Sequence, residues 1–202
     1  MWPVVNYCVT LLSFKCRSTP VECLHTLLLG PFKYMTEHLM NRLTASQKCE
    51  VQSKIRGFDF TPFPYSLSPG VCHHYLSFHG RDFKILAQVC LFTLWDHLLP
   101  AEKQVWLSLC KVHSPRWTLY TKQYQHETLQ VFQIAYCEQT EIDEVESRCQ
   151  DLIKHVKALD DSFLTRPKFH LLLHLADNVR EFGPTSAYNT ERYIHVPCHQ
   201  DH

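Results

Sequence analysis

Histidines and acids recur at helical spacing between residues 168 and 182. They are His170, His174, Asp177 and Glu181. Steps of four, three and four residues place all of them on one face of a helix. Two histidines one turn apart can share a divalent metal ion, but the H-E-x-x-H signature of zinc hydrolases is absent. The pattern therefore fits either a metal site at His170 and His174 or the polar face of an amphipathic helix, and spacing alone favours the polar face.

A second acid–histidine pair is formed by Glu22 and His25, which are three residues apart on a predicted helix. A carboxylate beside an imidazole can orient a proton relay or support a metal ligand. The alternative is that Glu22 completes a capping box for a helix that begins at Thr19 and Pro20. Spacing alone favours the capping role.

Two weaker groups also contain side chains that could carry chemistry. Cys72, His73 and His74 are consecutive, and His79 follows closely. Adjacent side chains diverge on a helix, so an ordinary polar helix is favoured over a metal site here. Glu191 begins a new segment after a glycine–proline turn, and a single acid in such a place is usually solvated.

The composition is that of a chain able to bury a core. It has 202 residues, of which 45% are hydrophobic and 20% are charged, and its formal net charge is zero. Nucleic-acid modules usually have a basic excess, so a DNA-binding role must rest on other features. No run of apolar residues is long enough to span a membrane, and residues 1–14 lack the basic start and cleavage site of a signal peptide.

Ten cysteines are present, without a C-x-x-C pair. This spacing argues against a zinc finger, and Cys90 and Cys149 fall on apolar helical positions. The cysteines are therefore interpreted as reduced, buried side chains of an intracellular protein.

Hydrophobic periodicity predicts a mainly α fold, an irregular helical bundle with few or no strands. The helices are predicted at 20–43 (two helices, separated at Gly30-Pro31), 48–56 (begun by Thr44 and Gln47), 71–77, 81–98, 100–112, 140–159 and 167–182, with an extended loop at 58–69.

Two of these helices have distinctive patterns. Residues 81–98 are apolar nearly all round, with Phe92 on the second side of the helix, and this predicts a central core helix. Residues 140–159 carry apolar residues at alternating three- and four-residue steps, as in a coiled coil. Self-association through residues 140–160 is therefore an expectation.

Three stretches resemble, in order and spacing, parts of fungal transposases of the CACTA and KDZ kind. Residues 19–31 resemble the acidic-x-x-His motif, residues 80–88 resemble the inserted helical region, and residues 167–192 resemble the segment around the last catalytic acid. The resemblance covers about residues 18 to 193.

The resemblance implies an RNase H-like parent in which Asp, Asp and Glu hold two divalent metals, usually Mg²⁺, for strand cleavage and joining. Glu22 and His25 match the acidic-x-x-His motif, although the family more often has Asp or Cys at the first position. Glu191 matches the final acid. The two aspartates belong upstream of residue 18, and residues 1–17 contain no Asp or Glu.

The expected identity is thus a nuclear, transposase-derived fragment, truncated at both ends and built on a remnant of the helical insertion. It is expected to be inactive in strand transfer, to need no cofactor of its own and to bind DNA by resemblance only. The alternative is a co-opted helical module that binds protein or DNA. A weaker alternative is a metal-binding hydrolase centred on His170 and His174.

The predicted organisation has one interruption. Residues 1–17 are unassigned, residues 18–193 form the transposase-like region, and residues 194–202 are a polar tail. Within the region, residues 113–130 are polar and aromatic, and joining 112 to 131 restores one amphipathic helix. These residues are predicted to be an insertion or a read-through intron that forms an exposed excursion.

Overall fold

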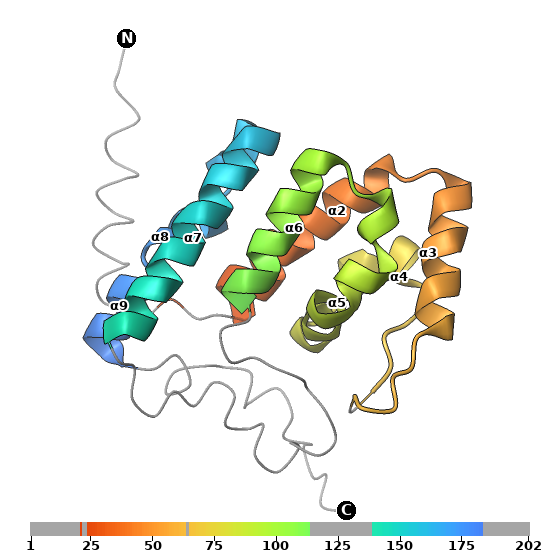
Figure 1. Ribbon diagram of the computed structural model, residues 1–202, viewed down its shortest axis with the longest axis horizontal. Coiled ribbons are helices and arrows are strands. Elements are labelled where there is room, and N and C mark those ends of the chain that lie inside the picture. The colour runs from red at the N-terminus through yellow and green to blue at the C-terminus, as the bar shows by residue number, and fades with distance from the viewer. Residues whose placement is uncertain (1–20, 22–23, 64, 114–138, 184–202) are drawn as a thin grey trace, which may run out of the picture.

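The structure, a computed structural model, describes residue 21 and residues 24–63, 65–113 and 139–183. These residues form eight α-helices and shorter helical turns, and no strand occurs among them. The helices pack as an irregular bundle (Figure 1). The predicted mainly α fold is confirmed for this part of the chain.

The elements follow one another in a simple order along the chain. They are η1 (Leu24–Phe32), α2 (Lys33–Arg42), α3 (Ala45–Gly57), α4 (Val71–His74), η2 (Tyr75–Ser77), α5 (Gly80–Thr93), η3 (Trp95–His97), α6 (Pro100–His113), α7 (Gln139–Leu159), η6 (Asp161–Thr165), α8 (Pro167–Leu173) and α9 (Leu175–Phe182). The wide turns of η1 are of the π type, and η2, η3 and η6 are tight 3₁₀ turns.

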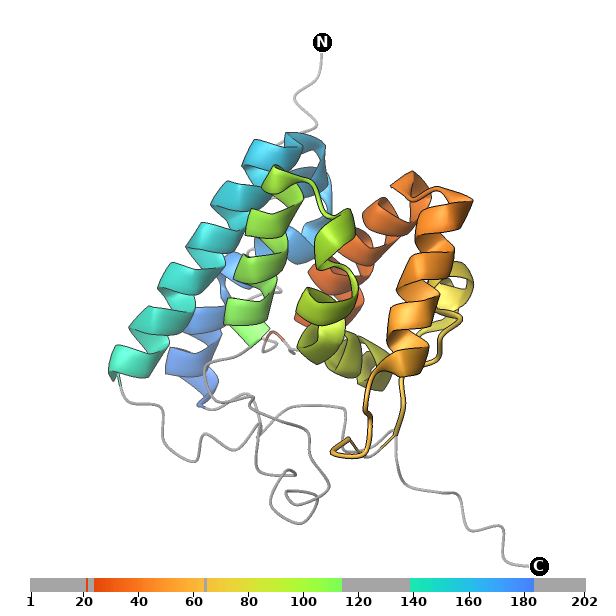
Figure 2. The ribbon, with the colours of Figure 1, turned by 45° about the vertical axis from the view of Figure 1, so that its right-hand side comes forward.

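One continuous hydrophobic core joins the helices. α6 packs along α7, and η1 packs against α2, α5 and α8. Figure 2 shows α6 and α7 side by side, with α3 at the other edge of the molecule. The largest fully buried side chains are Trp106, Phe32, Phe83, Phe169, Leu27, Leu28, Met35, Leu39, Met40, Ile55 and Leu67. In the helices predicted within residues 20–43 and at 100–112, the apolar residues at helical spacing are buried: Phe32, Met35, Leu39, Leu43, Val105, Trp106, Leu109 and Val112.

Two local signals in the sequence are confirmed in detail. Gly30 leaves the helical conformation (φ −113°, ψ −111°) directly before Pro31, which kinks the chain there. At α3, the backbone N–H of Gln47 donates to the Thr44 hydroxyl (3.3 Å), and the Thr44 N–H donates to Gln47 Oε1 (3.0 Å). This capping box starts α3 at Ala45, slightly earlier than predicted.

The predicted helix 81–98 is shorter than expected. α5 ends at Thr93, whose hydroxyl donates to the carbonyl of Val89 (3.0 Å), and a 3₁₀ turn follows. On its second side Ile85 and Val89 are buried, but Phe92 is 70% exposed and lies beside the ring of Phe58 (6.2 Å between centroids). The prediction that Phe92 fills the core was therefore wrong.

The predicted helix 167–182 is two helices. α8 ends at Leu173, and His174 adopts a non-helical conformation (φ −95°, ψ 0°) before α9 begins. The side-chain amide of Asn178 donates to the carbonyl of His174 (2.7 Å), and its oxygen accepts from the N–H of Val21 (2.9 Å). A buried asparagine that joins two segments thus stabilises the break. Gly183 (φ +79°) ends α9, as expected of a residue that tolerates positive φ.

Two further predictions concern α6 and α7. His113 is the last residue of α6, and its buried ring lies edge-on to Phe32 (5.8 Å), so it does not belong to an exposed insertion. Residues 114–130 lie outside the described residues. The apolar stripe of α7 is buried within the chain, so self-association through α7 would have to use its charged side. Within the described ranges, no helix is long and apolar enough to cross a membrane.

Candidate functional site

The two histidines singled out by their spacing do lie together. The Nε2 atoms of His170 and His174 are 3.1 Å apart, and the ring centroids are separated by 4.8 Å. His170 is exposed and His174 is half-buried. The sequence predicted one helix where α8 and α9 are separated by a break at His174. The two rings nevertheless lie together, as the spacing predicted.

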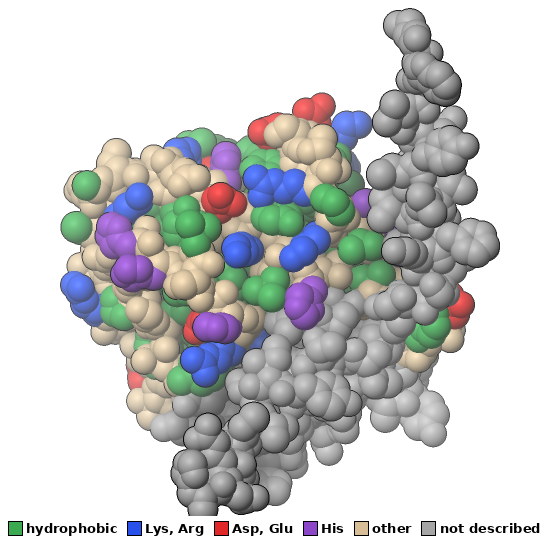
Figure 3. Space-filling model, turned by 180° about the vertical axis from the view of Figure 1, so that it is seen from behind, with side chains coloured by type: hydrophobic (Ala, Val, Ile, Leu, Met, Phe, Trp, Pro, Cys, Tyr) green, Lys and Arg blue, Asp and Glu red, His purple; other side chains and the backbone are tan. Residues whose placement is uncertain are grey.

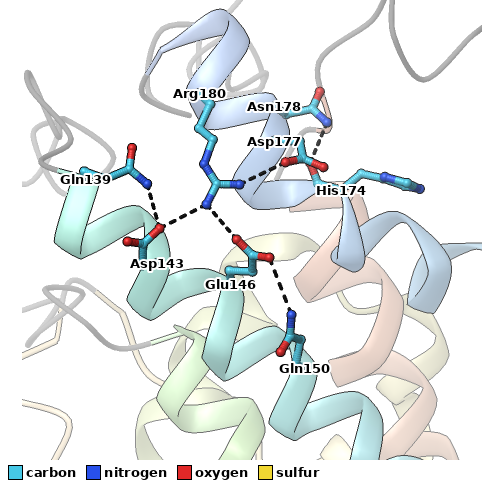
Figure 4. A network of polar contacts seen from close by, with 8 residues as sticks. All are labelled: Gln139, Asp143, Glu146, Gln150, His174, Asp177, Asn178 and Arg180. Carbon is cyan, nitrogen blue, oxygen red and sulfur yellow. Dashed lines mark hydrogen bonds and ion pairs between the residues drawn. The ribbon is translucent and has the colours of Figure 1, made fainter.

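The carboxylates predicted on the same face are not part of this pair. Asp177 Oδ1 accepts a hydrogen bond from Arg180 (2.9 Å), and Figure 4 shows its carboxylate directed to that guanidinium while the ring of His174 points away. Among the described residues, no group of three or more His, Cys, Asp or Glu side chains is placed to hold a metal. Within this part of the chain, a metal ion at the histidine pair would therefore have two protein ligands, His170 and His174.

Glu22 and Glu191, the two acids assigned by the resemblance, lie outside the described residues. His25 is exposed on η1. Two contacts attach this segment to α8 and α9: Val21 N–H donates to Asn178 (2.9 Å), and Lys168 Nζ donates to the carbonyl of Leu29 (2.6 Å). His25 lies between these anchors in the sequence.

The Cys72-His73-His74 group forms no shared site. The rings of His73 and His74 diverge, with centroids 6.5 Å apart. Cys72 is buried, and burial raises the pKa of its thiol to about 11. The N–H of His79 donates to Asp82 (2.8 Å) at the start of α5. The segment is helical, as predicted, and its interpretation as an ordinary helix rather than a metal site stays a prediction.

Most of the cysteines that the structure describes are buried, as predicted. Cys90 and Cys149 are buried, and burial raises the pKa of Cys149 to about 12. Cys90 Sγ lies 3.5 Å from Cys110 Sγ, and donation to Cys110 together with burial raises the pKa of Cys90. Cys49 is exposed.

Sequence reasoning missed the most deeply buried acid described. Glu102 is 1% exposed, and its carboxylate accepts from Arg42 Nε (2.9 Å), Arg42 Nη2 (2.6 Å) and the N–H of Leu99 (2.8 Å). His38 Nε2 lies 3.2 Å from the same carboxylate. Burial acts to raise the pKa of Glu102, but the donors from His38, Arg42 and Leu99 outweigh it and the pKa is lowered. With these donors satisfied, Glu102 joins α2 to α6 as a structural group.

Three cations lie on α2 and at the start of α8, and we call this region the α2–α8 face: Lys33, Arg166 and Lys168. The guanidinium of Arg166 lies over the ring of Tyr34 (4.3 Å), next in sequence to Lys33, and also 3.7 Å from Glu37. Figure 1 places α2 and α8 behind α6 and α7. In the rear view of Figure 3, lysine, arginine and histidine side chains spread across the molecule, and acidic side chains are fewer.

The described residues thus offer two arrangements with chemical meaning. One is a pair of imidazoles 3.1 Å apart, and the other is the set of cations on α2 and at the start of α8. The pair was predictable from i, i+4 spacing, whereas the face combines residues from distant parts of the chain. Comparisons of the chain with known protein families, with curated proteins and with solved structures found no match.

Proposed function

We propose that this chain is a transposase-derived helical module that holds DNA by its phosphate backbone and does not perform strand transfer by itself. The observation that carries the proposal is the α2–α8 face. The resemblance of about residues 18 to 193 to CACTA and KDZ transposases supports DNA, rather than protein, as the partner.

The three cations of this face are held in place by neighbouring groups. Lys168 Nζ donates to the carbonyl of Leu29 (2.6 Å), and Lys33 Nζ approaches the carbonyl of Leu76 (3.5 Å). An ammonium group has three donors, so either lysine can keep this contact and still bind a phosphate oxygen. The guanidinium of Arg166 is ordered by stacking on Tyr34 and lies 3.7 Å from Glu37, and its remaining N–H groups can donate to a phosphate oxygen. Side chains that are already ordered lose less conformational entropy when a ligand binds.

The net charge of zero does not exclude this role, because the charge is unevenly distributed. Acidic residues outnumber basic ones in α7, which lies in front of α8 in Figure 1. We propose that a duplex is contacted by Lys33, Arg166 and Lys168. Phosphate contacts of this kind give sequence-independent binding that weakens with salt.

The expected lack of strand transfer rests on the resemblance. Two-metal catalysis of phosphoryl transfer needs several carboxylates around one site. Of the three acids of the parent family, the resemblance assigns Glu191 alone to this chain. One carboxylate does not organise two metal ions, so the chain is expected to bind DNA without cutting it.

Binding is tested by fluorescence anisotropy of a labelled duplex at several salt concentrations. The variant Lys33→Gln/Lys168→Gln is compared with Lys154→Gln/Lys157→Gln, a matched control that removes two exposed lysines of α7. The first variant should bind about tenfold more weakly and reduce the salt slope by roughly two, because two phosphate contacts are lost. The control should bind like the natural chain.

Equal losses in the two variants would show that the α2–α8 face is not the binding surface. A chain that binds no duplex even at low salt would contradict the proposal. That result would favour the alternative, a helical module with a protein partner.

A further inference from the structure

We propose that His170 and His174 form a bidentate site for a divalent transition-metal ion such as Zn²⁺. The site would sit on the joint between α8 and α9. This inference is independent of DNA binding, because neither histidine belongs to the residues that define the α2–α8 face.

The spacing of the two nitrogens matches a chelate. Each imidazole nitrogen lies about 2.0–2.1 Å from a bound zinc ion, so two of them on a tetrahedral ion are about 3.3 Å apart. At a right angle between the two bonds the separation is about 2.9 Å. The observed Nε2–Nε2 distance of 3.1 Å falls between these values. Little ring movement is needed to place one ion between the two nitrogens.

The pair is already arranged for this without metal. At 3.1 Å one Nε2 carries a hydrogen and the other accepts it, so the two Nε2 atoms already face each other. When an ion binds, the donating ring moves its proton to Nδ1, and both Nε2 lone pairs then point to the metal. The number of protons on the two rings does not change in this step.

The backbone holds the second ligand in position. The N–H of His174 donates to the carbonyl of Leu171 (3.1 Å), and the carbonyl of His174 accepts from the side chain of Asn178 (2.7 Å). Asn178 is itself buried and bound to Val21 (2.9 Å). The turn that presents His174 is therefore fixed by contacts that do not involve its ring.

The coordination sphere would be completed mainly by water. Asp177, the nearest predicted carboxylate in the sequence, is held by Arg180 (2.9 Å) instead. A site with two protein ligands and an exposed position binds weakly and exchanges its ion readily. Binding would nonetheless stabilise the α8–α9 joint, because the ion favours the folded state to which it binds.

The test is a Zn²⁺ titration of the full ¹⁵N-labelled chain, followed through the imidazole nitrogens in long-range ¹H–¹⁵N spectra. The Nε2 signals of His170 and His174 should shift together at the same Zn²⁺ concentration. His170→Ala and His174→Ala should each weaken the response of the remaining ring at least about tenfold, since one ligand cannot chelate. His73→Ala is the matched control, because the rings of His73 and His74 diverge.

Two outcomes would overturn the proposal. One is that the two signals stay unchanged while other histidines or cysteines respond. The other is that His174→Ala leaves the response of His170 as it was. The titration of the natural chain decides the question even if a variant fails to fold, and circular dichroism checks that His170→Ala keeps its helices.

Discussion

Among the described residues, two arginine–carboxylate networks that join helices can be compared because they differ in their exposure to water. Arg42 binds Glu102, whose side chain is 2% exposed, with two nitrogens. Arg180 binds three carboxylates, all of them at least 40% exposed: Asp143, Glu146 and Asp177 (Figure 4). The second network has more ion pairs, yet the first should contribute more to stability.

The reason is the cost of leaving a charge without its partner. A buried carboxylate or its arginine cannot easily return to water when the partner is removed, so breaking such a pair is strongly destabilising. Exposed ion pairs are hydrated in either case and screened by salt, and they contribute little. Burial rather than the number of ion pairs therefore decides which network holds the bundle together.

The largest effect is expected from Glu102→Ala. The change leaves Arg42 and the N–H of Leu99 without their acceptor and opens space between α2 and α6. We expect a loss of about 3 kcal/mol in the free energy of unfolding, measured by urea denaturation. Glu102→Gln, which keeps the shape and an acceptor oxygen, should lose less. If Glu102→Ala lowers the free energy of unfolding by less than about 0.5 kcal/mol, the buried network contributes no more to stability than an exposed one, and the comparison fails.

An acid titration sharpens the comparison. The folded-state pKa of Glu102 is lowered from an ordinary value of 4.5, so the unfolded chain binds this proton at higher pH than the folded chain does. The stability contributed by the charged carboxylate is complete above the unfolded pKa and is lost as pH falls through the folded pKa. The difference in unfolding free energy between the natural chain and Glu102→Gln should be constant above about pH 5.5 and shrink below about pH 4.5. Urea denaturation across this pH range measures the difference in unfolding free energy. A difference that grows on acidification would contradict a lowered pKa of Glu102 in the folded state.

The smallest effect is expected from Arg180→Ala. The change removes two ion pairs between α7 and α9, to Asp143 and Glu146, and one within α9, to Asp177, but all three partners are exposed. The Tm should fall by only about 2 °C or less at low salt, and the difference should disappear in 0.5 M NaCl. Arg180→Lys provides the control that keeps the charge and loses the forked geometry. A Tm loss that persists in high salt would mean that packing, not charge, holds α9.

Local features of the fold were predictable from sequence. The capping box of Thr44 and Gln47 and the kink at Gly30-Pro31 depend on neighbouring residues alone, and both are present. The pairing of His170 with His174 likewise follows from spacing along one stretch of chain.

Features that depend on distant residues were not predictable. The break at His174 is stabilised by Asn178, which also binds Val21, 157 residues away. Arg42 and Glu102 are separated by 60 residues, so no local pattern could indicate that they meet. Phe92 is exposed, and its ring packs at the surface beside the ring of Phe58, which directly follows α3. Periodicity shows which side chains are apolar, but not which elements are present to cover them.

The central claim is that the chain holds DNA without cutting it, and one gel tests it directly. A supercoiled plasmid is incubated with the chain and Mg²⁺ or Mn²⁺ at low salt, and each sample is run with and without removal of the protein by detergent. We predict slower migration of the plasmid with protein and unchanged supercoiled DNA after its removal. Nicked or linear plasmid that depends on the metal and disappears in Glu191→Ala, or a plasmid that migrates unchanged in every sample, would contradict the account.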